Sequence, residues 1–127
     1  MKQVIRTHQA AQPSGTYSQA IKTANFVFLA GQIGLHPETN KLVEGGIEAQ
    51  LRQTWENVKA VVVAAGGDLQ QIVKITVFLQ DLAHAPLVNQ SMQAHFTEPY
   101  PARSMVQVAA LPKQALVEIE AILVLGD

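Results

Sequence analysis

Two stretches of the chain repeat apolar residues at helical spacing. Between residues 47 and 65, apolar side chains recur three and four positions apart and charged side chains occupy the other side, which predicts an amphipathic helix. The glycine pair at 66–67 predicts the end of this helix, because glycine adopts the left-handed cap conformation without a Cβ clash. A second helix is predicted from Pro86 to about residue 96, since proline suits the first turn of a helix.

Five other stretches have the pattern of β-strands. The apolar run at residues 25–33 predicts a strand buried on both faces, and residues 4–5 form a short candidate strand. Residues 104–109 and 116–124 predict two strands, which we expect to pair as a hairpin around a turn at residues 111–114. Residues 72–80 alternate, which predicts a half-exposed strand with four inward apolar side chains, Val73, Ile75, Val77 and Leu79.

The order of these elements predicts an α+β fold. The chain reads strand, strand, helix, strand, helix, strand, strand, and its 127 residues are the length of one domain, which we assign to residues 1–127. We predict a single mixed sheet that carries both helices on one face. The other face of the sheet is then left without a helical cover.

The composition is low in charge. Charged residues make up 15% of the chain, against about 25% in an average globular domain. Either uncharged polar side chains fill the surface, or part of the surface is buried against another subunit, and both explanations stay open. The net charge of −1 leaves no basic excess to hold a phosphate backbone, which argues against a dedicated DNA-binding protein.

Several features absent from the sequence narrow the chemistry. The chain has no cysteine, which excludes disulfides, thiolate nucleophiles and cysteine-based zinc sites. His84 and His95 would lie ~16 Å apart on one helix, too far to share an ion, so we expect no metal site. Neither a membrane-spanning apolar run nor a secretory signal is recognisable, so we expect a soluble cytoplasmic protein.

Three charged residues in the last third of the chain could form one polar patch. If the final two strands pair around residues 111–112, Arg103 lies opposite Glu120 and Met105 lies opposite Glu118. The patch is then either a cross-strand ion pair on a solvated sheet face, or a site. In a site, the guanidinium would hold a small carboxylate while a glutamate orients or deprotonates a water. The spacing alone does not decide between the two.

Short motifs recur along nearly the whole chain, from about residue 15 to residue 124. They are Tyr-Ser-Gln-Ala at 17–20, Ala-Gly-Gln-Ile at 30–33, Pro-Ala-Arg-Ser at 101–104 and, most specifically, Leu-Pro at 111–112 followed by Val-Glu-Ile-Glu-Ala at 117–121. In these motifs the chain resembles the Rid/YjgF family. It implies a fold like that of small homotrimeric chorismate mutases, in which three sheets pack into a barrel with clefts between adjacent subunits. It also implies hydrolysis of reactive 2-imino or enamine acids, such as 2-iminopropanoate and 2-iminobutanoate, to 2-keto acids and ammonia, with no cofactor or metal.

The resemblance further implies roles for the charged residues. Arg103 would clamp the substrate carboxylate in bidentate fashion, and Glu118 would hold the water that attacks the imine carbon. Tyr17 matches the family tyrosine that closes the cleft and counts with them as a catalytic residue. Glu120 matches the second acid of the same motif, where we expect structural support.

The expected substrate-binding positions include two departures from the family pattern. Gly31 would allow close backbone approach, and Asn89 would line the cleft. Ala30 stands where many members carry a serine, and Met105 stands where many carry cysteine or threonine. Met105 would offer backbone groups to the substrate, while its bulk narrows the pocket. Both departures bear on which imino acid is preferred.

Three function classes follow from these observations. The first is the imine deaminase, whose discriminating feature is the combination of Arg103 with Glu118. The second is a non-catalytic module that binds a small carboxylate or a partner protein. The third is an endoribonuclease or translation inhibitor, against which the near-neutral charge argues.

Overall fold

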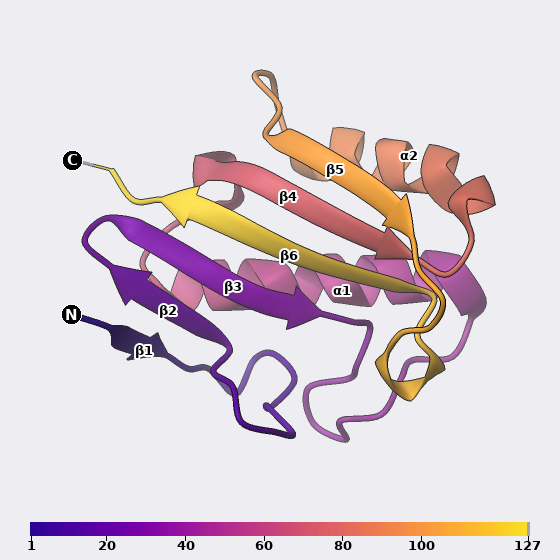
Figure 1. Ribbon diagram of the computed structural model, residues 1–127, viewed down its shortest axis with the longest axis horizontal. Helices are drawn as coiled ribbons and strands as arrows, with labels where there is room; N and C mark the ends of the chain where they lie inside the picture. Colours follow the sequence, from indigo (N-terminus) through magenta and orange to yellow (C-terminus); the bar gives the residue numbers. More distant parts are fainter. Residues whose placement is uncertain (127) are drawn as a thin grey trace.

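The computed structural model describes residues 1–126 as one six-stranded sheet with two helices packed on one face (Figure 1). In space the strands follow the order β1-β2-β3-β6-β4-β5; β4 and β5 are parallel, and all other neighbours are antiparallel. The mixed α+β sheet predicted from the sequence is therefore confirmed. The elements are β1 (Gln3–Ile5), β2 (Ala20–Thr23), β3 (Phe26–Gln32), α1 (Gly46–Ala64), β4 (Ile72–Leu79), α2 (Ala85–His95), β5 (Ala102–Gln107) and β6 (Val117–Val124), with short 3₁₀ turns at Leu69–Gln71, Leu82–His84 and Pro112–Gln114.

Helix α1 packs its apolar stripe against the middle of the sheet. Its buried side chains include Leu51, Trp55 and Val58, and the facing strands supply fully buried positions such as Ile75 and Ile119. The helix ends as the glycine pair predicts, because the residue at 66 has a φ of 90° and the amide at 67 donates to the carbonyl of residue 62 at 3.0 Å. Burial of this stripe is what fixes the helices to one face.

The individual strands differ from the sequence-based expectations at three points. Strand β2 was not expected, because four residues of mixed polarity carry too little periodicity to be recognised. Strand β3 is not buried on both faces in the single chain, since Phe26 is 47% and Phe28 is 45% exposed. Val73 also points outward, because the pairing between β4 and β6 shifts by one residue between Ile72 and Lys74 and turns its side chain away from the core.

The predicted hairpin between the last two strands is also wrong. Strand β5 pairs only with β4, and β6 lies between β3 and β4 (Figure 1). The reason is the crossover through α2, which returns the chain beside the strand it has just left and makes β5 parallel to β4. Arg103 is therefore in register with Ile75 rather than with Glu120, and Glu120 is in register with Thr76.

The face of the sheet opposite the helices carries large apolar side chains. Val4, Phe26, Phe28 and Val106 all lie on it and are all at least 43% exposed. The two phenylalanine rings stack with their centroids 6.2 Å apart. We call this surface the open face. Exposed apolar side chains gathered on one face are typical of surfaces at which proteins associate.

Candidate functional site

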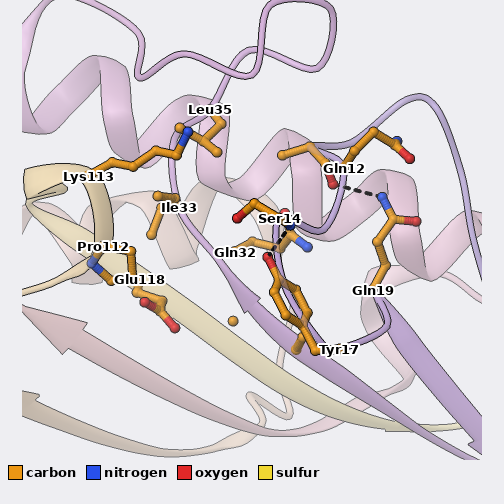
Figure 2. Close-up of a pocket in the computed structure, with 13 residues that line it drawn as sticks. Gln12, Ser14, Tyr17, Gln19, Gln32, Ile33, Leu35, Pro112, Lys113 and Glu118 are labelled. Carbon is orange, nitrogen blue, oxygen red and sulfur yellow. Dashed lines mark hydrogen bonds between the residues drawn. The ribbon is translucent and has the colours of Figure 1, made fainter.

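Four of the predicted site residues gather around one cavity of about 290 Å³ at the end of strand β3. Figure 2 shows Glu118 and Tyr17 on opposite sides of it. Ala30 and Gly31 form part of its wall. We call this the Glu118 cavity. The remaining lining residues come from the loop before β2, from the end of β3 and from the turn before β6, and are Ala11, Gln12, Ser14, Gln19, Gln32, Ile33, Leu35, Pro112 and Lys113.

Glu118 is the acidic group of this cavity. It lies half-buried on strand β6, two residues before Glu120 and on the same open face. Burial raises the pKa of Glu118 above its ordinary value, and the neighbouring negative charge of Glu120 raises it further. A carboxylate with a raised pKa is a better proton acceptor than a free one, which suits it to general acid–base work near neutral pH.

Gly31 is held against the side chain of Glu118 by an irregularity in the sheet. Leu29 pairs with Ala121 and Gln32 with residue 119, so two residues of β3 oppose one residue of β6. A Cβ atom at Gly31 would lie 2.7 Å from Cδ and 2.9 Å from Cγ of Glu118, and closer still to the carboxylate. Only glycine therefore leaves room for the carboxylate in this position.

Hydrogen bonds through Gln19 hold the wall that carries Tyr17. Gln19 is buried and bonds to both backbone groups of Thr7, at 2.7 and 3.0 Å, and to the carbonyl of Ala11 at 2.8 Å. Tyr17 is 52% exposed, and its hydroxyl accepts a bond from the amide of Ser14 at 3.4 Å. The phenol therefore stands at the rim of the cavity on a supported loop.

Lys113 brings a cationic side chain to the opposite rim. It adopts a left-handed backbone conformation, with a φ of 57°, and its Nζ donates to the carbonyl of Asn40 at 3.2 Å. Asn40 in turn accepts from the amide of Gln12 at 3.1 Å. Three segments far apart in the sequence are thus tied together around the cavity.

Arg103 lies apart from these residues, beside helix α2. Its Nη1 donates to Asn89 Oδ1 at 2.6 Å and to Met92 Sδ at 3.3 Å. The side chain is exposed and borders a second cavity of about 480 Å³, which we call the Arg103 cavity. The other residues that line it are Gln93, Tyr100 and Pro101.

Arg103 and Glu118 belong to opposite faces of the sheet. Arg103 is in register with Ile75, which is buried under the helices, whereas Glu118 is in register with Phe78, whose side chain is on the open face. The single polar patch drawn from hairpin pairing is therefore wrong. Within one chain, the guanidinium and the carboxylate cannot act on the same small molecule.

The structure places the remaining candidates on both sides of this division. Asn89 bonds to Arg103, and Glu120 is exposed on the open face beside Glu118. Met105 is in register with the buried Val77 and packs its side chain against the core, so it lines neither cavity. The expected narrowing of a pocket by its bulk has no counterpart in either cavity.

Sequence reasoning missed several residues at the two cavities. Lys113 follows Leu-Pro directly in the turn, and Gln19 lies within the Tyr-Ser-Gln-Ala motif. Their places in these motifs could have indicated that both residues line the site. Met92 had no such signal, because a methionine at helical spacing is typical of a core position. Its contact with Arg103 depends on a pairing that only the folded chain reveals.

Within residues 1–126 there is neither a cluster of side chains that could bind a metal ion nor a helix that could span a membrane. No three histidine, aspartate or glutamate side chains within this range come together in a way that could hold an ion. No helix there is both long and apolar enough to cross a bilayer.

Comparison with known proteins gives the same family over almost the whole chain. Residues 7–125 match the family model described as endoribonuclease L-PSP. A protein of Dermatophagoides farinae named 2-iminobutanoate/2-iminopropanoate deaminase is 45% identical over 124 residues, which are 98% of this chain and 97% of that protein.

Two solved structures have nearly the same fold. RidA from the Antarctic bacterium Psychrobacter is 50% identical, with a TM-score of 0.94 and coverage of 97% of this chain and 99% of that one. TdcF of E. coli with bound serine is 41% identical, with a TM-score of 0.89 and coverage of 98% and 99%. The chain belongs to the endoribonuclease L-PSP family, which is the Rid/YjgF family of the resemblance.

Proposed function

We propose that this protein hydrolyses reactive 2-imino acids and their enamine tautomers to 2-keto acids and ammonia. The relative from Dermatophagoides farinae carries the name of this activity, with 2-iminobutanoate and 2-iminopropanoate as its substrates. The observation that carries the proposal is the pair of complementary half-sites. One holds a cation suited to a carboxylate, and the other holds a carboxylate with a raised pKa suited to water.

The complete site in this proposal forms between two copies of the chain. Arg103 and Glu118 face opposite sides of the sheet, so a neighbouring copy must bring one to the other. The open face offers the contact, because Phe26 and Phe28 would be buried by association. Three copies with their open faces turned inward form the homotrimer that the family resemblance implies. The low charge of the chain fits an assembly in which this face is interior.

The proposed reaction begins with binding of the substrate carboxylate to Arg103 by two parallel hydrogen bonds. Glu118 accepts a proton from a water, whose oxygen forms a bond to C2 of the imine while the C=N electrons move to nitrogen. Glu118 passes this proton to the nitrogen, which gives a carbinolamine. Glu118 then accepts the hydroxyl proton of the carbinolamine and delivers it to the nitrogen, the carbonyl forms, the C–N bond breaks and ammonia leaves. Imine and water thus give keto acid and ammonia, and no other reactant is needed.

The remaining residues support these steps. Gly31 leaves the space in which the Glu118 carboxylate lies, and Tyr17 would close the cleft with its hydroxyl directed at the substrate or the water. Ala30 lines the cavity without a hydroxyl, which removes one hydrogen bond worth about 0.5–1.5 kcal/mol to a substrate that could use it. Met105 would contribute backbone groups only, because its side chain packs against the core.

An assay with imines generated in place by an amino-acid oxidase tests the proposal. The wild-type protein should speed the release of 2-oxobutanoate and pyruvate. Arg103→Ala should abolish this activity while the oligomer stays intact. A wild-type rate in the Arg103 variant would remove the clamp from the mechanism.

A second candidate is a module that binds a small carboxylate without turning it over. The observation in its favour is the structure of TdcF, a relative that holds serine, an amino acid with a carboxylate of this kind. Saturable binding of 2-oxobutanoate together with no hydrolysis of any imine would favour this function. The family description as an endoribonuclease has less support here, because the net charge is −1.

A further inference from the structure

The Arg103 guanidinium uses one nitrogen for all of its hydrogen bonds within residues 1–126. Nη1 donates to Asn89 Oδ1 at 2.6 Å and to Met92 Sδ at 3.3 Å, whereas Nε and Nη2 make no such bond there. Nη1 carries two hydrogens, and these two acceptors use both. The guanidinium is therefore fixed along one side and free along the other.

Both acceptors come from one face of helix α2. Asn89 and Met92 are three residues apart, so their side chains lie one above the other on the helix. Met92 is 5% exposed and packs in the core, while Asn89 is at the surface. The sulfur thus supports the guanidinium from the inner side and the amide oxygen from the outer side. Arg103 reaches them because its register with Ile75 turns it toward the helices.

Two edges of a guanidinium can grip a carboxylate with parallel hydrogen bonds. One edge consists of Nη1 and Nη2, and the other consists of Nε and Nη2. In this protein the first edge is compromised, because both hydrogens of Nη1 point to Asn89 and Met92. The second edge has its donors available.

We infer that Asn89 and Met92 are positioning residues, which commit Nη1 to the protein and so reserve the Nε/Nη2 edge of Arg103 for the substrate carboxylate. This inference rests on the proposed function, in which Arg103 is the clamp. It changes the role of Asn89 from a substrate contact to a support of the clamp. A guanidinium already oriented before binding loses less entropy when the carboxylate arrives.

The uncharged nature of both acceptors is part of this inference. An amide oxygen and a thioether sulfur orient the guanidinium without cancelling its charge. An aspartate at position 89 would orient it equally well but would also neutralise it and compete with the incoming carboxylate. Asn89→Asp therefore separates orientation from charge.

Steady-state kinetics on three variants test this role. Met92→Leu should raise KM about 3-fold, because the weaker hydrogen bond, to the sulfur, is lost. Asn89→Leu should raise KM about 10-fold, because the stronger hydrogen bond, to the amide oxygen, is lost. Asn89→Asp should raise KM more than Asn89→Leu does. All three should keep kcat within about 2-fold, because the clamp binds substrate and transition state alike. Gln90→Asp is the matched control for Asn89→Asp. Gln90 is exposed on the same helix and lies outside the Arg103 cavity, and its substitution by aspartate adds the same negative charge.

A spectroscopic measurement supplies a readout that a loss of packing would not move. In ¹⁵N-arginine-labelled protein, addition of 2-oxobutanoate should shift the Nε–H resonance of Arg103, and the shift should need more ligand in the Asn89 and Met92 variants. An unshifted Nε–H resonance at saturating ligand would overturn the inference. Wild-type KM in folded Asn89→Leu, which changes an exposed side chain, would overturn it as well.

The outcomes for Arg103→Ala and for the wild-type protein distinguish failure of this inference from failure of the proposed function. If Arg103→Ala is inactive but the Asn89 and Met92 variants have wild-type KM, only the positioning role is wrong. If Arg103→Ala itself retains wild-type KM and kcat, the clamp and the positioning role are both wrong, while imine hydrolysis stands. If the wild-type protein hydrolyses no imine, the proposed function itself fails.

Discussion

Gly31→Ala should inactivate the proposed deaminase without unfolding the chain. The added Cβ would lie 2.7 Å from Cδ of Glu118, whereas non-bonded carbons prefer about 3.5–4.0 Å, so the carboxyl group must retreat by about 1 Å. The partner is the end of a half-buried side chain and not a backbone segment, so the side chain can move while the strand keeps its pairing.

Displacement of the Glu118 carboxyl group should lower the rate of the reaction. A displacement of about 1 Å in a group that positions the reacting atoms reduces the rate about 100-fold, equivalent to about 2.7 kcal/mol in the barrier. We expect kcat for 2-iminobutanoate, generated in place by an amino-acid oxidase, to fall by about that factor. Circular dichroism and thermal unfolding should show that the variant keeps its fold.

Gly126→Ala is the matched control for this substitution. A Cβ there would meet its nearest neighbour, Gln71 Nε2, at 3.6 Å, which is ordinary contact, and the residue lines neither cavity. Its kcat should equal that of the wild type. A folded Gly31→Ala protein with kcat within about threefold of the control would refute the reasoning, because the position of the Glu118 carboxylate would then be unimportant.

Three further predictions address stability and assembly. The pKa of Glu118 is raised in the folded state, so ionisation of this carboxyl group lowers the stability of the fold as the pH rises above about 4. Glu118→Gln should therefore have a higher Tm than the wild type at pH 7, and the difference in Tm should disappear toward pH 4. A difference in Tm that persists at low pH would contradict the electrostatic origin. Asn57→Leu should lower the free energy of unfolding, measured in urea, by about 2–4 kcal/mol. Buried Asn57 donates to the carbonyls of Ile33 and Leu35 at 3.1 and 2.9 Å, and both carbonyls would lose their partner. A loss below about 1 kcal/mol would mean that water replaces the amide. Phe28→Lys should shift the protein to a monomer in light scattering after size exclusion and should abolish activity, because it places a charge on the open face; an unchanged oligomer would assign assembly to another surface.

The elements that the sequence predicts correctly are those set by local pattern. Helix α1 is recognisable because its buried stripe and its terminal glycine lie within about twenty consecutive residues. The pairing of the last strands was predicted wrongly, because adjacency in sequence favours a hairpin and nothing local reveals that β6 lies between β3 and β4. Pairing between distant strands depends on which arrangement buries the most apolar surface in the whole chain.

The candidate site shows the same division. Family motifs identify Arg103 and Glu118, but their placement on opposite faces follows from the register of each with β4, about 30 to 40 residues away. The contact of Met92 with Arg103 and the place of Lys113 at the cavity rim depend on packing between elements, for which a single sequence has no direct signal.

Mixing two inactive variants tests most directly whether the site is shared between chains. Arg103→Ala and Glu118→Gln protein, refolded together in equal amounts, should form mixed oligomers in which some clefts combine an intact arginine from one copy with an intact glutamate from its neighbour. Random assembly gives about one quarter of the clefts this composition, so about a quarter of wild-type activity should return. Activity that stays at the level of the separate variants, in oligomers shown by mass spectrometry to be mixed, would contradict a site built from two copies.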